Sequence, residues 1–170
     1  MKFKDIPKFT RVGSWQANME WKYFIEWIDE NIKENDLQLN PDFQRGHVWT
    51  EEQQTAYIEF RLRGGTTGKL VYLNCPGWMG DFRGDFVCVD GLQRITAIQR
   101  FMNNEIKAFD TYYKDFEDKL PRDLDMIVNV NNLKTRKEVL QWYIEMNNGG
   151  TPHTKEEINR VKILLETEKI

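Results

Sequence analysis

The stretch Phe86-Val-Cys-Val-Asp-Gly-Leu-Gln-Arg-Ile-Thr-Ala-Ile-Gln-Arg-Phe101 decides the fold of this chain. It opens with four consecutive apolar residues, 86–89, which is typical of a short strand covered on both faces. Asp90 and Gly91 then mark an abrupt turn. Apolar residues recur at helical spacing after this turn, at Ile95, Ile98, Phe101 and Met102. We expect Asp90 to be the N-cap of this helix and Gln93 to complete a capping box.

Arg94 lies in the first turn of the predicted helix, next to backbone N–H groups that have no acceptor within the helix. Free N–H groups, the positive end of the helix dipole, the glycine at position 91 and an arginine together favour an anion such as phosphate. The same residues also fit a plain strand–helix corner with a surface arginine. From the local sequence the two interpretations are equally well supported.

The composition is that of a soluble protein with one domain. The chain has 170 residues, of which 40% are hydrophobic and 30% charged. Its apolar runs are strand-sized and its first residues lack an apolar signal core, so we expect a cytoplasmic protein without a membrane segment. Cys75 and Cys88 are expected to be buried thiols. The formal net charge of -3 leaves only a local patch for DNA, such as Lys2, Lys4, Lys8 and Arg11.

The order of predicted elements indicates an α+β domain with a small mixed sheet, helices packed on one side of it and a helical C-terminal part. We treat residues 1–170 as a single domain, with an extended arm at 1–17, a core at 18–110 and a mostly helical extension at 111–170. Strands are expected at 36–40, 70–75, 85–89, 106–109 and 126–130. Helices are expected to begin at Asn18, Thr50, Asp90, Thr111, Thr135 and Thr154. Thr50 with Gln53 and Thr135 with Glu138 are expected to cap their helices as capping boxes. The helix after Thr50 is expected to bury Ala56, Tyr57 and Phe60.

A polar loop at 40–49 is the first of two further segments that are candidates for the same site. Its apolar residues Phe43, Val48 and Trp49 are expected to anchor it to the core. Gln44 and Arg45 lie between these anchors, so their polar ends would be held in fixed directions.

The second segment is Asn147-Asn-Gly-Gly150, which is also typical of a helix C-cap. A glycine-rich loop at 64–68 is a weaker candidate. It lacks the Lys-Ser/Thr ending of a phosphate-binding loop, because Lys69 is followed by Leu70. We therefore expect this loop to be a simple connection.

Three motifs, taken in order, resemble the N-terminal domain of GmrSD-type (type IV) restriction endonucleases. They are Phe43-Gln44-Arg45 followed by Trp49, then Val89-Asp90-Gly91-Leu92-Gln93-Arg94, then Glu145-Met-Asn147-Asn-Gly149-Gly150-Thr-Pro. Together they span residues 41 to about 158, and their order gives the resemblance its specificity. The second motif corresponds to the Asp-Gly-Gln-Gln-Arg (DGQQR) signature of that family. The family domain in turn resembles ParB and sulfiredoxin.

The resemblance implies a ParB/sulfiredoxin-like fold that binds a nucleoside triphosphate with Mg2+ and, in some relatives, hydrolyses it to control DNA cleavage. A separate nuclease domain of the HNH class cuts the DNA in such relatives. This chain has no room for that domain and only two histidines. We therefore expect a standalone sensor, one subunit of a split system, or a small phage-type protein that interferes with restriction. The implied partners are the nucleotide, DNA and a nuclease subunit or other restriction protein.

The resemblance also assigns the site. Catalytic residues are Asp90, Gln93 and Gln44, nucleotide-binding residues are Gly91, Arg94, Arg45, Asn147 and Asn148, and Asp90 is the metal ligand. The arginines would pair with phosphate oxygens, and the glutamines would orient a water molecule. Leu92 departs from the family, which has a glutamine there. Because leucine can neither bind phosphate nor orient water, Leu92 favours binding over hydrolysis.

Two alternative functions stay open. One is a non-catalytic DNA- or protein-binding module, favoured by Leu92 and by the short chain, with Trp78 and Phe82 as candidate contacts. The other is DNA nicking by the ParB-like core itself. Nicking needs a cluster of metal-bound carboxylates, for which the sequence offers Asp81, Asp85 and Asp90.

Overall fold

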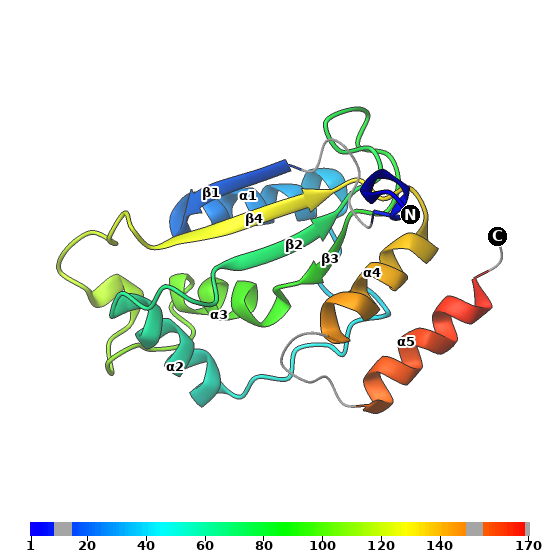
Figure 1. The fold of residues 1–170 in the computed structure, drawn as a ribbon. Helices are drawn as coiled ribbons and strands as arrows, with labels where there is room; N and C mark the ends of the chain where they lie inside the picture. Colours follow the sequence, from blue (N-terminus) through cyan, green and yellow to red (C-terminus); the bar gives the residue numbers. More distant parts are fainter. Residues whose placement is uncertain (9–14, 149–154, 169–170) are drawn as a thin grey trace.

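A four-stranded mixed sheet forms the centre of the protein (Figure 1). The computed structural model describes residues 1–8, 15–148 and 155–168. The strands are β1 (Trp15–Glu20), β2 (Leu70–Asn74), β3 (Val87–Asp90) and β4 (Asp125–Asn131). Their order is β1-β4-β2-β3, with β2 and β4 parallel and the two outer pairs antiparallel.

Five helices accompany the sheet in the described residues. They are α1 (Trp21–Asn35), α2 (Glu51–Leu62), α3 (Leu92–Met102), α4 (Arg136–Asn148) and α5 (Lys155–Thr167). Short 3-10 turns cover Phe3–Asp5 and Tyr113–Asp115. The predicted α+β class with a small mixed sheet is confirmed. No helix in the described ranges has the length and apolar character to cross a bilayer.

The helices cover both faces of the sheet, so the prediction that they pack on one side is wrong. Successive side chains of a strand point to opposite faces. Cys88 belongs to the core that α1, α2 and α3 form, whereas Val87 and Val89 belong to a second core with α4 and α5. Figure 1 shows α4 and α5 together, apart from α1, α2 and α3. The apolar run of β3 is therefore buried on both faces, as the sequence predicts.

The N-terminal boundary of the core differs from the prediction. Residues 15–17 are not part of an arm, and Asn18 does not cap a helix, because both lie in β1, which pairs with β4. The Asn18 side-chain amide instead donates to Asp125 Oδ2 at 3.3 Å. The helix begins at Trp21, whose N–H donates to Leu124 C=O at 2.8 Å. The pairing partner lies more than 100 residues away, so the local sequence gives no sign of it.

The predicted helix at 111–120 is also wrong. Only the 3-10 turn Tyr113–Asp115 forms there, followed by irregular backbone. Its aromatic residues pack as single side chains onto α3, with ring centroids of Tyr113 and Phe116 at 5.7 and 6.2 Å from that of Phe101. The strands expected at 36–40 and 106–109 are reduced to isolated bridges, Gln38–Val87 and Ala108–Thr111.

Helix α2 turns a partly polar face to the core, contrary to the predicted burial of Ala56 and Phe60. Its buried residues are Gln54, Ile58 and Arg61. Arg61 is only 1% exposed and donates to Asp125 C=O at 2.8 Å. Because the Gln54 amide and the terminal nitrogens of Arg61 find partners, these residues can occupy positions that a hydrophobicity pattern assigns to solvent. The predicted capping boxes of Thr50 with Gln53 and of Thr135 with Glu138 are confirmed.

Candidate functional site

The strand–helix corner forms at Gly91. Asp90 is the last residue of β3 and pairs with Tyr72 of β2, while Gly91 takes the N-cap position of α3. Gly91 has φ of 127°, and a Cβ placed on it would lie 3.0 Å from Val71 Cγ2. Glycine is therefore required here both by conformation and by space. The prediction that Asp90 caps the helix is wrong, because the strand continues through it.

We predicted that Gln93 completes a capping box, and this is wrong. Gln93 holds the loop 40–49 instead. Its Oε1 accepts hydrogen bonds from the N–H groups of Val48 and Trp49, both at 3.0 Å. Its Nε2 donates to Gly46 C=O at 2.9 Å. Three hydrogen bonds from one side chain therefore fix the second half of the loop to the first turn of α3.

Gln44 fixes the first half of the same loop. Its Nε2 donates to Cys88 C=O at 3.0 Å and to Val89 C=O at 2.8 Å. These carbonyls belong to β3, an edge strand of the sheet, so the glutamine ties the loop to the backbone of that strand. Two glutamines thus hold the loop to the corner. Arg45 lies in the loop between Gln44 and Gly46, the first loop residue that Gln93 binds.

Arg94 projects from the corner and forms an ion pair with Asp90, with Nη2 and Oδ2 2.8 Å apart. The Arg94 side chain is 21% exposed, and among the described residues its buried Nε has no hydrogen-bond partner. The glycine-rich loop reaches this arginine, because a Cβ on Gly68 would lie 3.9 Å from Arg94 Cδ. That loop is therefore a neighbour of the corner, which its sequence did not indicate.

Tyr143 of α4 marks the centre of a charged group that faces the corner. Burial raises the pKa of Tyr143 to about 12, and Arg45, Glu157, Arg160 and Asp90 are close enough to influence it. Arg45 and Glu157 form a loose ion pair at 3.7 Å. The structure therefore brings the predicted residues Asp90 and Arg45 to one place.

Arg160 of α5 is a site residue that the sequence prediction missed. Its Nη2 donates to Gln44 C=O at 2.7 Å and lies 3.4 Å from Phe43 C=O. In the sequence it is one charged residue among several on an amphipathic helix. Only the packing of α5 beside α4 brings it to the loop.

The predicted asparagines lie at the end of α4. Asn147 Nδ2 donates to Tyr143 C=O at 2.7 Å, a bond within the helix. The Asn148 side chain and the expected C-cap at 149–150 lie outside the described residues. The structure therefore does not bring these asparagines into contact with the corner in the part that it describes.

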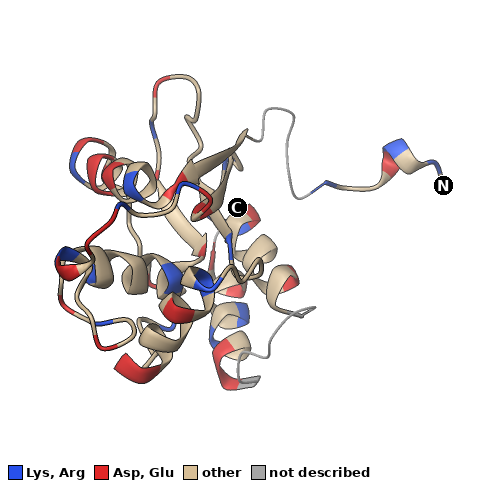
Figure 2. Cartoon of the chain, turned by 90° about the vertical axis from the view of Figure 1, so that its left-hand side faces the viewer, with Lys and Arg blue, Asp and Glu red and all other residues tan. Residues whose placement is uncertain are grey.

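The carboxylates proposed for DNA nicking do not gather. Asp81 and Asp85 line a groove beside the end of α1, whereas Asp90 lies at the opposite end of β3. In residues 1–8, 15–148 and 155–168, no three His, Cys, Asp or Glu side chains are placed to hold a metal ion together. In Figure 2 basic and acidic segments are interspersed, without a broad basic face in that view.

Comparison with known proteins identifies the family. A family model described as "GmrSD restriction endonuclease, N-terminal domain" matches residues 24–131, which include the loop 40–49 and the corner at Gly91. The match ends with β4, before α4 and α5. No curated protein and no solved structure matches the chain. Because the match covers more than half of the 170 residues, the chain belongs to the family of GmrSD restriction endonuclease N-terminal domains.

Proposed function

We propose that this protein binds a nucleoside triphosphate with Mg2+ at the Gly91 corner, as the nucleotide-sensing domain of a restriction system. Membership in the family supplies the link to restriction. The triphosphate is our inference from the site, and so is the ParB/sulfiredoxin-like character of the fold. A cytoplasmic location, where DNA restriction takes place, goes with this role.

The proposal rests on three guanidinium groups that three elements supply around the corner. Arg94 comes from α3, Arg45 from the loop 40–49 and Arg160 from α5. Arg45 and Arg160 influence Tyr143 together with Asp90 and Glu157, and Arg94 is linked to them through its ion pair with Asp90. These three cations and two carboxylates sum to +1. The whole chain carries -3, so this is a local excess that favours an anion.

Backbone groups support the same ligand. The first hydrogen bond of α3 runs from Ile95 N–H to Gly91 C=O at 2.9 Å. The Leu92 N–H contacts the buried Cys88 sulfur, whereas the N–H groups of Gln93 and Arg94 have no acceptor within the helix and point out of its N-terminal end. Because Gly91 has no side chain, a phosphate group can approach these donors closely.

The contacts of the two glutamines favour binding over rapid hydrolysis. The side-chain amides of Gln93 and Gln44 both form hydrogen bonds with backbone atoms. Leu92, where relatives carry a glutamine, is buried and apolar. We therefore assign Gln93 and Gln44 a role in positioning the loop around the nucleotide, with any NTPase activity slow. Asp90 is half exposed and free to reach Mg2+ once phosphate replaces it at Arg94.

A thermal-shift titration tests the proposal. The parent protein should be stabilised by at least one of ATP, GTP and CTP in the presence of Mg2+, because a ligand that binds only the folded state raises its stability. Arg94→Ala and Arg160→Ala should each weaken this effect while circular dichroism stays unchanged. Arg83→Ala is the matched control, because Arg83 is 87% exposed on a distant loop. Equal stabilisation of the parent and Arg94→Ala would contradict the proposed site.

A non-catalytic DNA- or protein-binding module is the second candidate, favoured by the engaged glutamines and by Leu92. Phosphate-release assays, together with binding and nicking assays on plain and modified plasmid DNA, distinguish the two. Nucleotide binding followed by slow phosphate release supports the first function. Tight DNA or partner binding without any nucleotide effect supports the second.

A further inference from the structure

An open groove in the described residues lies away from the corner, and every charged residue that lines it is acidic. It has a volume of about 820 Å³ and runs between the end of α1 and the loop before β3. Glu34, Asp36, Asp81 and Asp85 line it. Lys33 pairs with Glu34 at 3.2 Å and Arg83 with Asp81 at 3.5 Å, so Asp36 and Asp85 account for the excess negative charge. Such a surface attracts a basic segment.

The groove also offers apolar contacts. Ile32 and Phe82 line it and remain 38% and 40% exposed. Phe82 is held in place from below, because its ring packs edge-on against Trp78 with centroids 5.3 Å apart. An occupant of this groove would therefore combine positive charge with one or two apolar side chains.

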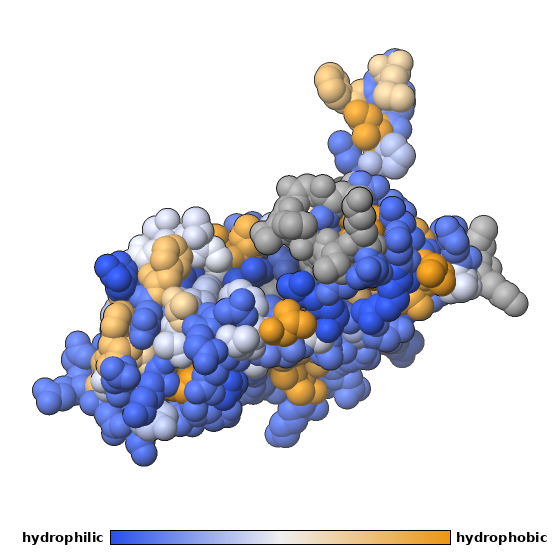
Figure 3. Space-filling view, turned by 90° about the horizontal axis from the view of Figure 1, so that it is seen from below, coloured by the Kyte–Doolittle hydropathy of each residue, from blue (hydrophilic) through white to orange (hydrophobic). Residues whose placement is uncertain are grey.

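The N-terminal segment 1–8, which we call the arm, has this composition. Its sequence is Met-Lys-Phe-Lys-Asp-Ile-Pro-Lys, with three lysines, one aspartate and four apolar residues. Phe3 is 89% exposed, and all eight residues are exposed to solvent. Asp5 accepts a hydrogen bond from Lys2 N–H at 3.0 Å, which shapes the arm into a short 3-10 turn. Figure 3 shows the arm standing out from the body of the molecule with apolar and hydrophilic atoms together.

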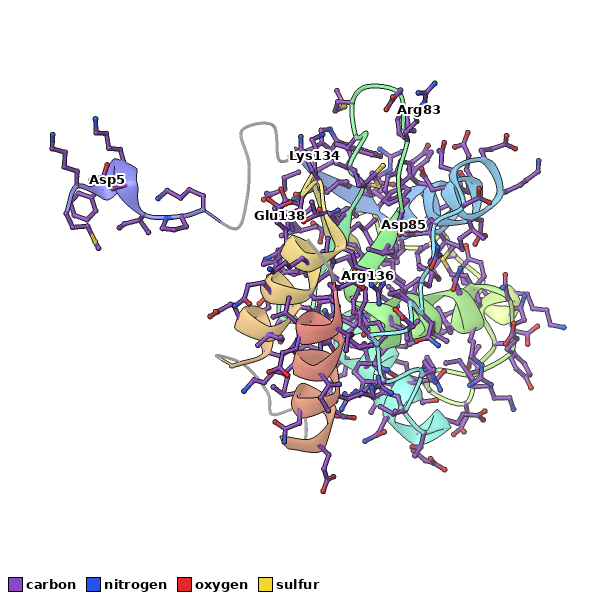
Figure 4. The ribbon with its side chains drawn as sticks, turned by 90° about the vertical axis from the view of Figure 1, so that its right-hand side faces the viewer. Asp5, Arg83, Asp85, Lys134, Arg136 and Glu138 are labelled. Carbon is purple, nitrogen blue, oxygen red and sulfur yellow. The ribbon has the colours of Figure 1, made fainter. Side chains whose placement is uncertain are left out.

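The arm of one molecule lies apart from its own groove. In Figure 4, Asp5 of the arm is well to the left of the body, whereas Asp85 is near the middle of the body and Arg83 at its upper edge. The arm of one molecule can therefore enter the groove of another and leave its own groove for the arm of that partner. Such reciprocal exchange closes a two-fold symmetric dimer.

We propose that two copies of this chain associate by exchanging their arms, each arm binding in the acidic groove of the other copy. The lysines of the arm pair with the groove carboxylates, and Phe3 and Ile6 cover Ile32 and Phe82. This interface is separate from the nucleotide corner and does not depend on nucleotide binding.

The oligomeric state tests this proposal. We expect sedimentation velocity at low salt to show a concentration-dependent dimer of the parent that weakens at high salt, because the screening length falls from about 10 Å at 0.1 M to about 3 Å at 1 M. Reversing the arm charges with Lys2→Glu, Lys4→Glu and Lys8→Glu should weaken association by roughly tenfold or more. The groove changes Glu34→Lys and Asp85→Lys should do the same, and combining both sets should restore the dimer. A parent that stays monomeric, or combined changes that fail to restore association, would overturn the proposal.

A disulfide test separates exchange between copies from binding of the arm to its own body. The native Cys75 and Cys88 are buried, so introduced cysteines can be oxidised selectively. A mixture of Lys4→Cys and Glu34→Cys proteins should give a covalent heterodimer, which an arm bound to its own groove cannot produce. Glu117→Cys, at an exposed position away from the groove, should not cross-link with Lys4→Cys. If Glu34→Cys and Glu117→Cys cross-link equally with Lys4→Cys, the arm does not bind in the groove.

Discussion

Arg94 and Asp90 form an ion pair at 2.8 Å across the corner where β3 becomes α3. The pair joins the guanidinium that we assign to phosphate with the carboxylate that we assign to Mg2+. Each group therefore neutralises the other, and the triphosphate that we propose would have to compete with Asp90 for Arg94.

This competition predicts that Asp90→Asn raises nucleotide affinity without Mg2+ and reduces the affinity gained by adding Mg2+. Without the metal, the variant should bind the triphosphate about two- to fivefold more tightly, because a negative charge next to the phosphates is lost. With Mg2+, the parent should gain more affinity than the variant. Isothermal titration calorimetry measures both, with Asp118→Asn as an exposed control. An identical response of parent and Asp90→Asn to Mg2+ would remove Asp90 from the metal site.

Gln93→Ala should lower the free energy of unfolding by about 1–3 kcal/mol, because it deletes three hydrogen bonds between α3 and the loop 40–49. Urea denaturation measures the change. Gln99→Ala on the same helix is the matched control, since its side chain makes one exposed hydrogen bond to Asp29, and we expect a change within about 0.5 kcal/mol. If the two variants cost the same, Gln93 does not hold the loop in solution.

Gly91→Ala should destabilise the protein by about 1–3 kcal/mol through backbone strain, with a further cost from contact with Val71. Gly64→Ala separates the two terms, because Gly64 also has positive φ, 85°, but a Cβ there meets no atom within 4 Å. Gly91→Ala should therefore melt at a lower temperature than Gly64→Ala. Equal melting temperatures would show that the close approach to Val71 is not a constraint.

The free energy of unfolding should fall at alkaline pH partly because of Tyr143. Its folded-state pKa is raised to about 12 by burial, whereas the unfolded chain ionises near pH 10. Unfolding therefore releases a proton in this window, so the stabilising contribution is complete below about pH 10 and is lost as pH rises through about 12. Tyr143→Phe should flatten the decline, and Tyr23→Phe, at an exposed position, should not. Parallel stability curves for parent and Tyr143→Phe would contradict this.

Local sequence patterns predicted those elements whose stabilising contacts are also local. The capping boxes at Thr50 and Thr135 join residues three positions apart, so the motif contains the whole interaction. The run 86–89 predicted a strand buried on both faces because each of its residues is apolar. Gly91 was predicted to allow the turn, and its positive φ confirms this.

Elements that depend on distant partners could not be predicted in this way. Strand β1 exists because β4 lies beside it, and Asp90 became a strand residue because Tyr72 pairs with it. Gln93 looked like a capping residue, but the loop 40–49 offers it three backbone partners where the cap would offer one. The helix expected at 111–120 does not form. Tyr113 and Phe116 of this segment pack against Phe101 instead, and local periodicity cannot show these contacts.

The sequence by itself determined the strand, the glycine corner and the resemblance to the GmrSD family, because each of the motifs behind them consists of residues close together in the chain. Only the tertiary structure decided what surrounds them. It added Arg160, paired Arg94 with Asp90 and turned the glutamines toward backbone carbonyls and N–H groups. The reason is that charge balance and hydrogen-bond partners are set by groups that meet in space, and most of these lie dozens of residues apart in the chain.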